Sequence, residues 1–248
     1  MSPITKEVIE TERLRLIRIS DTSLTGDHLK WFHANWVDPV ATSWRYTLPL
    51  PHAAQADVRS LHGKCKTLEE SQAWFTEHLE RYDTITYIVF SRFNAEGEEL
   101  EYPGEVLGNV GLRTQAKGAE LPPFPRDTAA PTSDQTPTDP STPPLSSLDI
   151  HKPFNLRSLG YSFLQIAWGK GYATEAGRAV IDAYREGTKE AREKGEVYYV
   201  EAIWSPENVA SGKVLGKLGF RTIGYKEEER VWLAGDWRYG YNVSGLYV

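Results

Sequence analysis

The sequence predicts one mixed α/β (α+β) domain, in which strands and helices alternate along the chain. Its hydrophobic content of 40% and charged content of 25% are those of a globular protein with a buried core. In some stretches apolar residues recur with the period of two that is typical of strands, and in others at helical spacing. A length of 248 residues is enough for one good-sized core and does not require two domains. We therefore expect residues 1–248 to form a single domain.

The first elements are a strand and a short helix. Between Thr11 and Ile19, Leu14 and Leu16 alternate with charged side chains, which is the pattern of a half-buried strand. Asp27 belongs to a residue type that often precedes the first helical turn. We therefore expect Asp27 to cap the helix that follows.

A second helix and two further strands follow before residue 115. Thr67 to Glu70 has the spacing of a capping box, in which side chains satisfy the free N–H groups of a helix start. This helix is expected to continue to about Tyr82. Strands are predicted over Tyr87–Phe90 and Val106–Leu112, with a turn at Asn94–Gly97 between them.

The C-terminal half repeats the alternation. The apolar run from Leu159 to Leu164 predicts a strand, and apolar residues at helical spacing then continue to about Lys194. The remaining predicted elements are a strand over 197–203, a helix over 208–219 and one or two closing strands over 232–248.

One stretch, roughly residues 115–155, has a different composition. Eight of the fifteen prolines lie between Pro122 and Pro144, mixed with Thr, Ser, Asp and Ala. Proline supplies no backbone donor and biases its neighbours to extended conformations, so helix and interior strand are both disfavoured here. We interpret this stretch as a surface insertion, flexible or polyproline-like. A lid over a binding site and a partner-binding segment are the two alternatives.

A glycine-containing turn leads from the predicted strand at 159–164 into the next helix. Gly169 and Gly171 lack a Cβ atom, so the backbone there can bend tightly and approach a ligand closely. A helix start offers N–H groups without intrahelical partners and partial positive charge, which together favour phosphate. The turn is not a Walker loop, and it lacks the third glycine of a dinucleotide fingerprint.

Three longer strings carry a family resemblance. Gly160-Tyr161 followed after a gap by Trp-Gly-Lys-Gly-Tyr-Ala-Thr-Glu-Ala at 168–176 resembles the acyl-CoA pyrophosphate loop of the GNAT acetyltransferases, and most of all their RimJ/RimL branch. The string from Asn208 to Phe220 resembles the second hallmark of the family, and Thr11 to Leu14 resembles the usual start of that branch. The resemblance implies a mixed, mostly antiparallel central sheet flanked by helices.

The resemblance also implies a reaction and a set of binding residues. Acetyl-CoA would be the co-substrate, and the acetyl group would pass to a primary amine by direct attack in a ternary complex. The acceptor would be a protein N-terminal α-amine or a small-molecule amine. The residues that the resemblance assigns to CoA binding are Leu164, Trp168, Gly169, Lys170, Gly171, Tyr172, Ala173, Thr174, Asn208 and Ser211.

Ser211 and Glu201 are the main candidates for proton transfer. The resemblance implies that Ser211 contacts the CoA sulfur and delivers a proton to it. Independently of the resemblance, Tyr225 and Tyr241 are alternative acids. An alkyl amine has a pKa near ~10 and must lose a proton before it attacks. Glu201, acting through water, is the candidate base. The sequence departs from the family where Ile223 stands at a position that often holds Glu.

Aromatic residues gather in the loop-rich region that covers the acceptor cleft in the family. Trp36, Trp44 and Tyr46 can shape an amine pocket there or pack beneath the loops, and the sequence leaves both interpretations open. A non-catalytic acyl-CoA-binding module that interacts through the Pro-rich segment is the alternative to an enzyme.

Composition argues against several other classes of function. A net charge of −6 and a pI near 5.6 disfavour binding to nucleic acid or to an anionic membrane surface. The single cysteine, Cys65, excludes an internal disulfide, and the six histidines lack ligand spacing, so we expect no metal. With no secretory signal and no apolar run long enough to span a membrane, a cytoplasmic protein is expected. Oligomeric state is not predicted.

Overall fold

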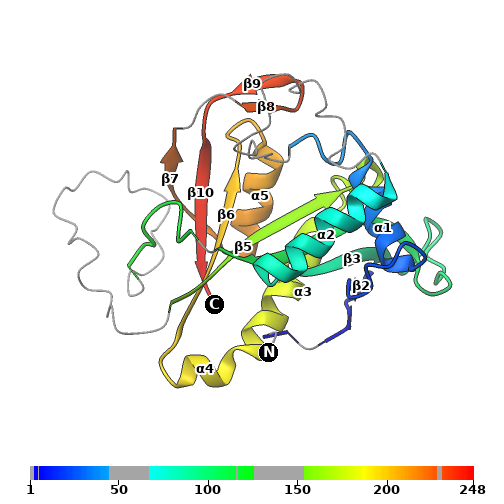
Figure 1. Cartoon of the computed structure of the whole chain (residues 1–248), viewed down its shortest axis with the longest axis horizontal. Helices are drawn as coiled ribbons and strands as arrows, with labels where there is room; N and C mark the ends of the chain where they lie inside the picture. Colours follow the sequence, from blue (N-terminus) through cyan, green and yellow to red (C-terminus); the bar gives the residue numbers. More distant parts are fainter. Residues whose placement is uncertain (1–2, 5, 45–66, 116, 126–153, 228–230) are drawn as a thin grey trace.

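A twisted sheet forms the centre of the computed structural model, which describes residues 3–4, 6–44, 67–115, 117–125, 154–227 and 231–248 (Figure 1). Within these residues the sheet has eight strands in the order β1-β2-β3-β4-β5-β6-β10-β7, and β8 and β9 form a separate hairpin. Only β5 and β6 are paired parallel; every other neighbouring pair in the sheet is antiparallel. The prediction of a mixed, mostly antiparallel sheet flanked by helices is confirmed.

The strands are β1 (Val8–Glu10), β2 (Leu14–Arg18), β3 (Ile85–Ser91), β4 (Glu105–Thr114), β5 (Phe154–Phe163), β6 (Val197–Trp204), β7 (Arg221–Lys226), β8 (Val231–Leu233), β9 (Asp236–Arg238) and β10 (Tyr241–Tyr247). The helices are α1 (Asp27–Trp36), α2 (Leu68–Tyr82), α3 (Tyr172–Gly187), α4 (Lys189–Glu193) and α5 (Val209–Leu218), with a short 3-10 turn at Gln165–Ala167.

Helices cover both faces of the sheet because successive strand residues point to opposite sides. Leu14 and Leu16 of β2 lie in the larger hydrophobic core, which α3 and α5 complete. Ile17 faces the other way, into a smaller core that α1 and α2 build from aromatic side chains. We call these two sides of the sheet the α3 face and the α1 face.

The two helices of the α1 face begin differently. Thr67 caps α2 as predicted, because its hydroxyl accepts a hydrogen bond from the Glu70 N–H at 3.2 Å. Asp27 does not cap α1: the cap position is Gly26, and Asp27 lies in the first helical turn. An acidic side chain in that turn still interacts favourably with the helix dipole.

The helix predicted to run to about Lys194 is interrupted at Thr188. α3 ends at Gly187, where a Cβ atom would overlap the backbone carbonyl of Pro3, so the N-terminal segment passes directly against the end of this helix. The Thr188 hydroxyl donates to the carbonyl oxygen of Tyr184 at 2.8 Å, and α4 then begins in a new direction (Figure 1).

The predicted insertion is narrower than residues 115–155, since Phe154 and Asn155 already belong to β5. Residues 117–125 pack on the sheet instead of forming a loose loop: the ring of Phe124 meets that of Tyr247 edge-on at 5.2 Å, and Glu120 forms an ion pair with Lys226 at 2.5 Å. The proline-rich centre, 126–153, lies outside the described residues, and so do the flexible, lid and partner-binding interpretations of it.

Candidate functional site

The parallel strands β5 and β6 separate part of the way along their length. Their pairing runs from Phe154 opposite Val197 to Ser158 opposite Glu201, and beyond that point β5 pairs only with β4 and β6 only with β10. In Figure 1 the arrows of β5 and β6 diverge beyond this point. A pocket of about 580 Å³ is lined by residues of both faces of the sheet at this opening.

On the α3 face, the pocket is bordered by the glycine loop. Gly169 and Gly171 have φ angles of 73° and 82°, a left-handed backbone that favours glycine. Gly171 is the N-cap of α3 and supplies no side-chain cap, so the first N–H groups of the helix are open to an anion. Thr174 lines the pocket at the same place.

Two side chains hold this loop in position. The guanidinium group of Arg13 donates from Nη1 to the carbonyl oxygen of Lys170 at 3.0 Å and lies over the ring of Tyr172. The indole N–H of Trp168 donates to the carbonyl oxygen of Phe163 at 2.8 Å, which ties the loop back to the end of β5. The glycine loop is therefore held in place by its contacts with Arg13 and with the end of β5.

Arg13 is in turn held by Glu175 in the first turn of α3. The Glu175 carboxylate accepts from the Thr11 hydroxyl at 2.6 Å, from the Arg13 backbone N–H at 3.0 Å and from Arg13 Nε at 2.8 Å. Burial by itself would raise the pKa of Glu175, but these hydrogen bonds outweigh it and hold the pKa below its usual range.

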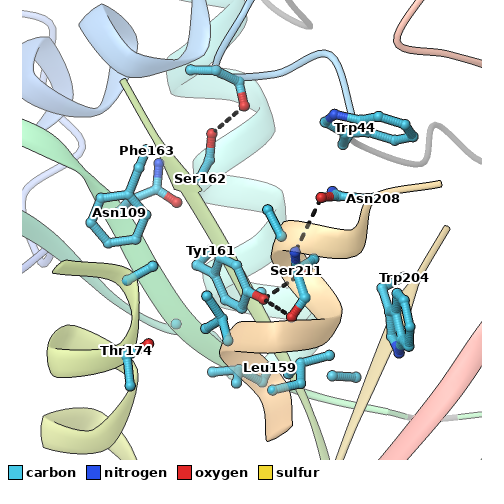
Figure 2. A pocket seen from close by; sticks show the side chains of 18 of the residues that line it. Trp44, Asn109, Leu159, Tyr161, Ser162, Phe163, Thr174, Trp204, Asn208 and Ser211 are labelled. Atoms are coloured by element: carbon cyan, nitrogen blue, oxygen red, sulfur yellow. Dashed lines mark hydrogen bonds between the residues drawn. The ribbon is translucent and has the colours of Figure 1, made fainter. Parts of the chain in front are cut away.

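Ser211 lies inside the pocket, where it meets a tyrosine that sequence reasoning did not single out for its side chain. The hydroxyl groups of Tyr161 and Ser211 are 2.7 Å apart (Figure 2). Burial raises the pKa of Tyr161 to about 12, so this phenol keeps its proton at neutral pH. The alternation of Leu159, Tyr161 and Phe163 places all three on the α3 face, which is the signal that could have identified Tyr161.

Asn208 caps the helix that carries Ser211. Its side-chain oxygen accepts a hydrogen bond from the Ser211 N–H at 3.1 Å, so it fixes the first turn of α5 (Figure 2). Asn208 also lines the pocket, so the contact with CoA that the resemblance implies is compatible with its role as a cap. Pocket-lining Trp204 packs against the same helix, since a Cβ atom added at Gly212 would strike its ring.

On the α1 face, the pocket is lined by aromatic rings and a glycine floor. Trp36 is fully buried, with its ring 4.1 Å from that of Trp74, so it belongs to the core and also borders the pocket. Trp44 lines the pocket, whereas Tyr46 lies outside the described residues. Gly111 and Gly160 are direct partners across β4 and β5, and they leave the middle of the floor without side chains.

Glu201, the predicted base, is not among the residues that line the pocket. It is fully buried on the α1 face beneath the segment 117–125, where its Oε2 accepts from the Glu120 N–H at 2.9 Å. Oε1 has no hydrogen-bond partner among the described residues. Burial raises the pKa of Glu201 to about 7, against the opposing hydrogen bond from Glu120.

Of the other predicted site residues, some line the pocket and others do not. Trp168, Tyr172 and Ala173 line the pocket, but Leu164 and Lys170 do not; Lys170 is exposed and contributes its carbonyl oxygen to Arg13. The alternative acids Tyr225 and Tyr241 lie outside the pocket lining as well. The described residues contain no group of three or more His, Cys, Asp or Glu placed to hold a metal ion.

Comparisons with known proteins agree with this geometry. Residues 134–221 match the family model described as the acetyltransferase (GNAT) domain. A search of curated proteins found no match. Solved structures of similar fold include a GNAT-family acetyltransferase from Bacillus anthracis, with a TM-score of 0.51, 16% identity and coverage of 97% of this chain and 98% of that chain.

Two further structures of similar fold contain coenzyme A. RimL, a ribosomal α-N-protein acetyltransferase in complex with coenzyme A, has a TM-score of 0.54, 15% identity and coverage of 98% of both chains. A spermidine N-acetyltransferase from Vibrio cholerae, in complex with CoA and spermine, has a TM-score of 0.52, 12% identity and coverage of 96% of both chains.

The split parallel pair, the glycine loop and these similarities define a fold of the GNAT class. Residues 134–221 match the GNAT acetyltransferase domain, and the resemblance predicted from the motifs is confirmed. At identities of 12% to 16%, the likeness to RimL and the other solved structures is a likeness of fold. None of the described helices has the length and apolar character needed to cross a membrane.

Proposed function

We propose that this protein transfers an acetyl group from acetyl-CoA to a primary amine within a ternary complex. The observation that carries the proposal is the opening between β5 and β6, where one pocket is lined from both faces of the sheet. A donor held on the α3 face and an acceptor held on the α1 face can meet there. Holding both reactants in this way supplies much of the rate enhancement that such a reaction needs.

The donor half has the groups that CoA requires. The open N–H groups at the start of α3 and the adjacent Thr174 suit the pyrophosphate. Lys213 and Lys217 of α5 line the pocket and add positive charge on this side. Beyond Ser158, the edge of β5 that no longer pairs with β6 offers backbone groups to the pantetheine arm and to the developing oxyanion.

The reaction forms one bond and breaks one bond. The amine nitrogen attacks the thioester carbonyl carbon, a C–N bond forms, and the C–S bond breaks as the tetrahedral intermediate collapses. The departing thiolate takes a proton from the Ser211 hydroxyl, and Tyr161 replaces that proton through the 2.7 Å hydrogen bond between them. The proton lost by the amine passes to water, and water returns one proton to Tyr161, so that both hydroxyl groups are restored.

Two classes of amine are candidates for the acceptor. The resemblance to the RimJ/RimL branch and the fold shared with RimL favour a protein N-terminal α-amine. The fold is equally shared with a spermidine N-acetyltransferase, which represents small-molecule amines.

Thermal stabilisation by CoA and acetyl-CoA, with ATP and NAD as controls, is the first test. A ligand that binds the native state selectively raises its apparent stability by mass action. We expect a shift with CoA and acetyl-CoA alone, followed by release of thiol from acetyl-CoA when amines are supplied. A CoA-dependent shift without thiol release across a broad amine panel would instead identify an acyl-CoA-binding module.

A further inference from the structure

The α1 face of the pocket carries a charge pattern that distinguishes among acceptors. None of the described residues that line the pocket is Asp or Glu, whereas Arg113 of β4 lines it on this face. Arg113 is half-buried, and no hydrogen bond or ion pair joins its side chain to another residue that the structure describes. A guanidinium group that faces a pocket without a protein partner is available to bind an anion through charge-assisted hydrogen bonds.

The position of Arg113 in the sheet determines where such an anion would bind. It lies opposite Ser158 on β5, two residues along the floor from the Gly111–Gly160 pair, and the Asn109–Ser162 pair lies two residues further on. At a strand rise of ~3.3 Å per residue, the Arg113–Ser158 pair and the Asn109–Ser162 pair are about 13 Å apart along the strands. The glycine pair between them leaves a floor that accepts a flat or extended group.

Aromatic side chains contribute much of the lining on this side. Phe32 and Trp36 of α1 and Trp74 of α2 line the pocket together with the polar residues His78, Thr84 and Thr86, and the rings of Phe32 and Trp74 stack at a centroid distance of 5.6 Å. The pocket therefore offers apolar surface as well as a cation to a bound acceptor.

We propose that Arg113 is an anion subsite, and that the acceptor is a primary amine whose apolar body carries a carboxylate at its far end. This inference rests on the proposed function and narrows its acceptor. It disfavours polyamines, because the described lining offers cations and no carboxylates to a second ammonium group. The carboxylate can belong to a small aromatic amino acid analogue or to an acidic residue near the N-terminus of a peptide.

Matched acceptors test the subsite through thiol release. We would compare 4-(2-aminoethyl)benzoate with 2-phenylethylamine, and a peptide Ser-Ala-Glu-Ala amide with Ser-Ala-Ala-Ala amide, with spermidine as the cationic control. We expect kcat/KM to favour the carboxylate member of at least one pair by about tenfold or more. The pair that responds identifies the source of the carboxylate. A preference for the neutral members or for spermidine would overturn the proposal.

Arg113→Met removes the charge and keeps most of the side-chain length. We expect the ratio of kcat/KM between the carboxylate and the neutral acceptor to fall to about one while thermal stabilisation by CoA persists, and Arg113→Lys should restore part of that ratio. Lys117→Met is the matched control, because Lys117 is exposed and does not line the pocket. A preference that survives in Arg113→Met would show that another group binds the carboxylate.

A binding measurement separates this inference from the proposed function. 4-Ethylbenzoate lacks the amine and cannot react, so its stabilisation of the CoA complex reports the anion subsite alone. We expect stabilisation of the wild type and none of Arg113→Met. Stabilisation without any thiol release would support the subsite and contradict acetyl transfer, whereas thiol release without stabilisation by the carboxylate would contradict the subsite only.

The floor offers a steric test of the same path. A Cβ atom at Gly160 would meet nothing within 4 Å, so Gly160→Leu projects into the pocket without strain in the sheet. We expect acceptor KM to rise with the CoA-induced thermal shift unchanged. Gly216→Ala, at an exposed glycine of α5 with equally open surroundings, is the control for fold. Unchanged kinetics in Gly160→Leu would place the acceptor elsewhere.

Discussion

Arg13 and Glu175 join two distant parts of the sequence, with Nη2 of the guanidinium group 2.6 Å from Oε2 of the carboxylate. Arg13 lies immediately before β2, and Glu175 lies in the first turn of α3. The same guanidinium group reaches the Lys170 carbonyl, so it connects the sheet, the helix and the glycine loop. The loop geometry therefore depends on a residue far from it in the chain.

Arg13→Ala should weaken CoA binding without unfolding the protein. Because Arg13 holds the Lys170 carbonyl, its loss leaves the loop free to move, and we expect the dissociation constant of CoA to rise roughly three- to tenfold. Isothermal titration with CoA measures this. Arg185→Ala is the control, since Arg185 pairs with Asp182 on the same helix away from the loop; equal effects in both variants would contradict a specific role for Arg13.

Gly171→Glu should abolish CoA binding. The new side chain adds bulk and negative charge where the pyrophosphate would lie, and a φ of 82° also strains any residue with a Cβ atom. Gly235→Glu is the matched control, because Gly235 has the same φ and open surroundings but does not line the pocket. Unchanged CoA affinity in a folded Gly171→Glu protein would mean that the loop does not bind phosphate.

Ser211→Ala should slow turnover and leave acetyl-CoA affinity nearly normal. Loss of a general acid typically lowers the rate by about 10²-fold or more. The measurement is kcat and KM for acetyl-CoA as a function of pH. A rate that matches wild type at every pH would remove Ser211 from the proton transfer.

Tyr161→Phe tests whether the two hydroxyl groups act as a unit. We expect a smaller fall in kcat than for Ser211→Ala, because the serine keeps its own proton but loses its hydrogen-bonded neighbour. The double variant should be no slower than Ser211→Ala, as groups that work together are non-additive. Rate losses that multiply would show that the tyrosine acts independently of Ser211.

Glu201→Gln should change how stability depends on pH. Burial raises the pKa of Glu201 from an ordinary 4.5 to about 7, so its unfolded form ionises first as pH rises. Stability is therefore fully present below about pH 4.5 and is lost as pH rises towards 7. Glutamine does not titrate, and the Tm of Glu201→Gln relative to wild type should increase from pH 5 to pH 8. A constant difference would contradict the raised pKa.

Local patterns in the sequence were sufficient for most of the fold. Alternation of apolar and charged residues located β2, and the capping box at Thr67 located the start of α2, because both signals depend only on neighbouring residues. The close approach of the Pro3 backbone to Gly187 at the end of α3 was not predictable, since it joins two distant parts of the sequence.

The site residues also divide into those that local motifs predicted and those whose surroundings depend on strand pairing. The glycine loop, Ser211 and Asn208 follow from short motifs, and each of them lines the pocket as expected. Glu201 was chosen as a base for its residue type, but register with Ser158 turns it to the α1 face, and the segment 117–125 then covers it. Successive residues of a strand point to opposite faces of the sheet, and only the pairing of strands determines which neighbours each side chain contacts.

By itself, the sequence determined the alternation of strands and helices, the phosphate-type turn and the family that these motifs resemble, because each is encoded within a few consecutive residues. Tertiary structure alone decided the partnership of Tyr161 with Ser211, the clamp of Arg13 on the loop and the place of Arg113 in the pocket. These contacts join residues brought together by strand order and by the separation of β5 from β6, and no local pattern records such distances.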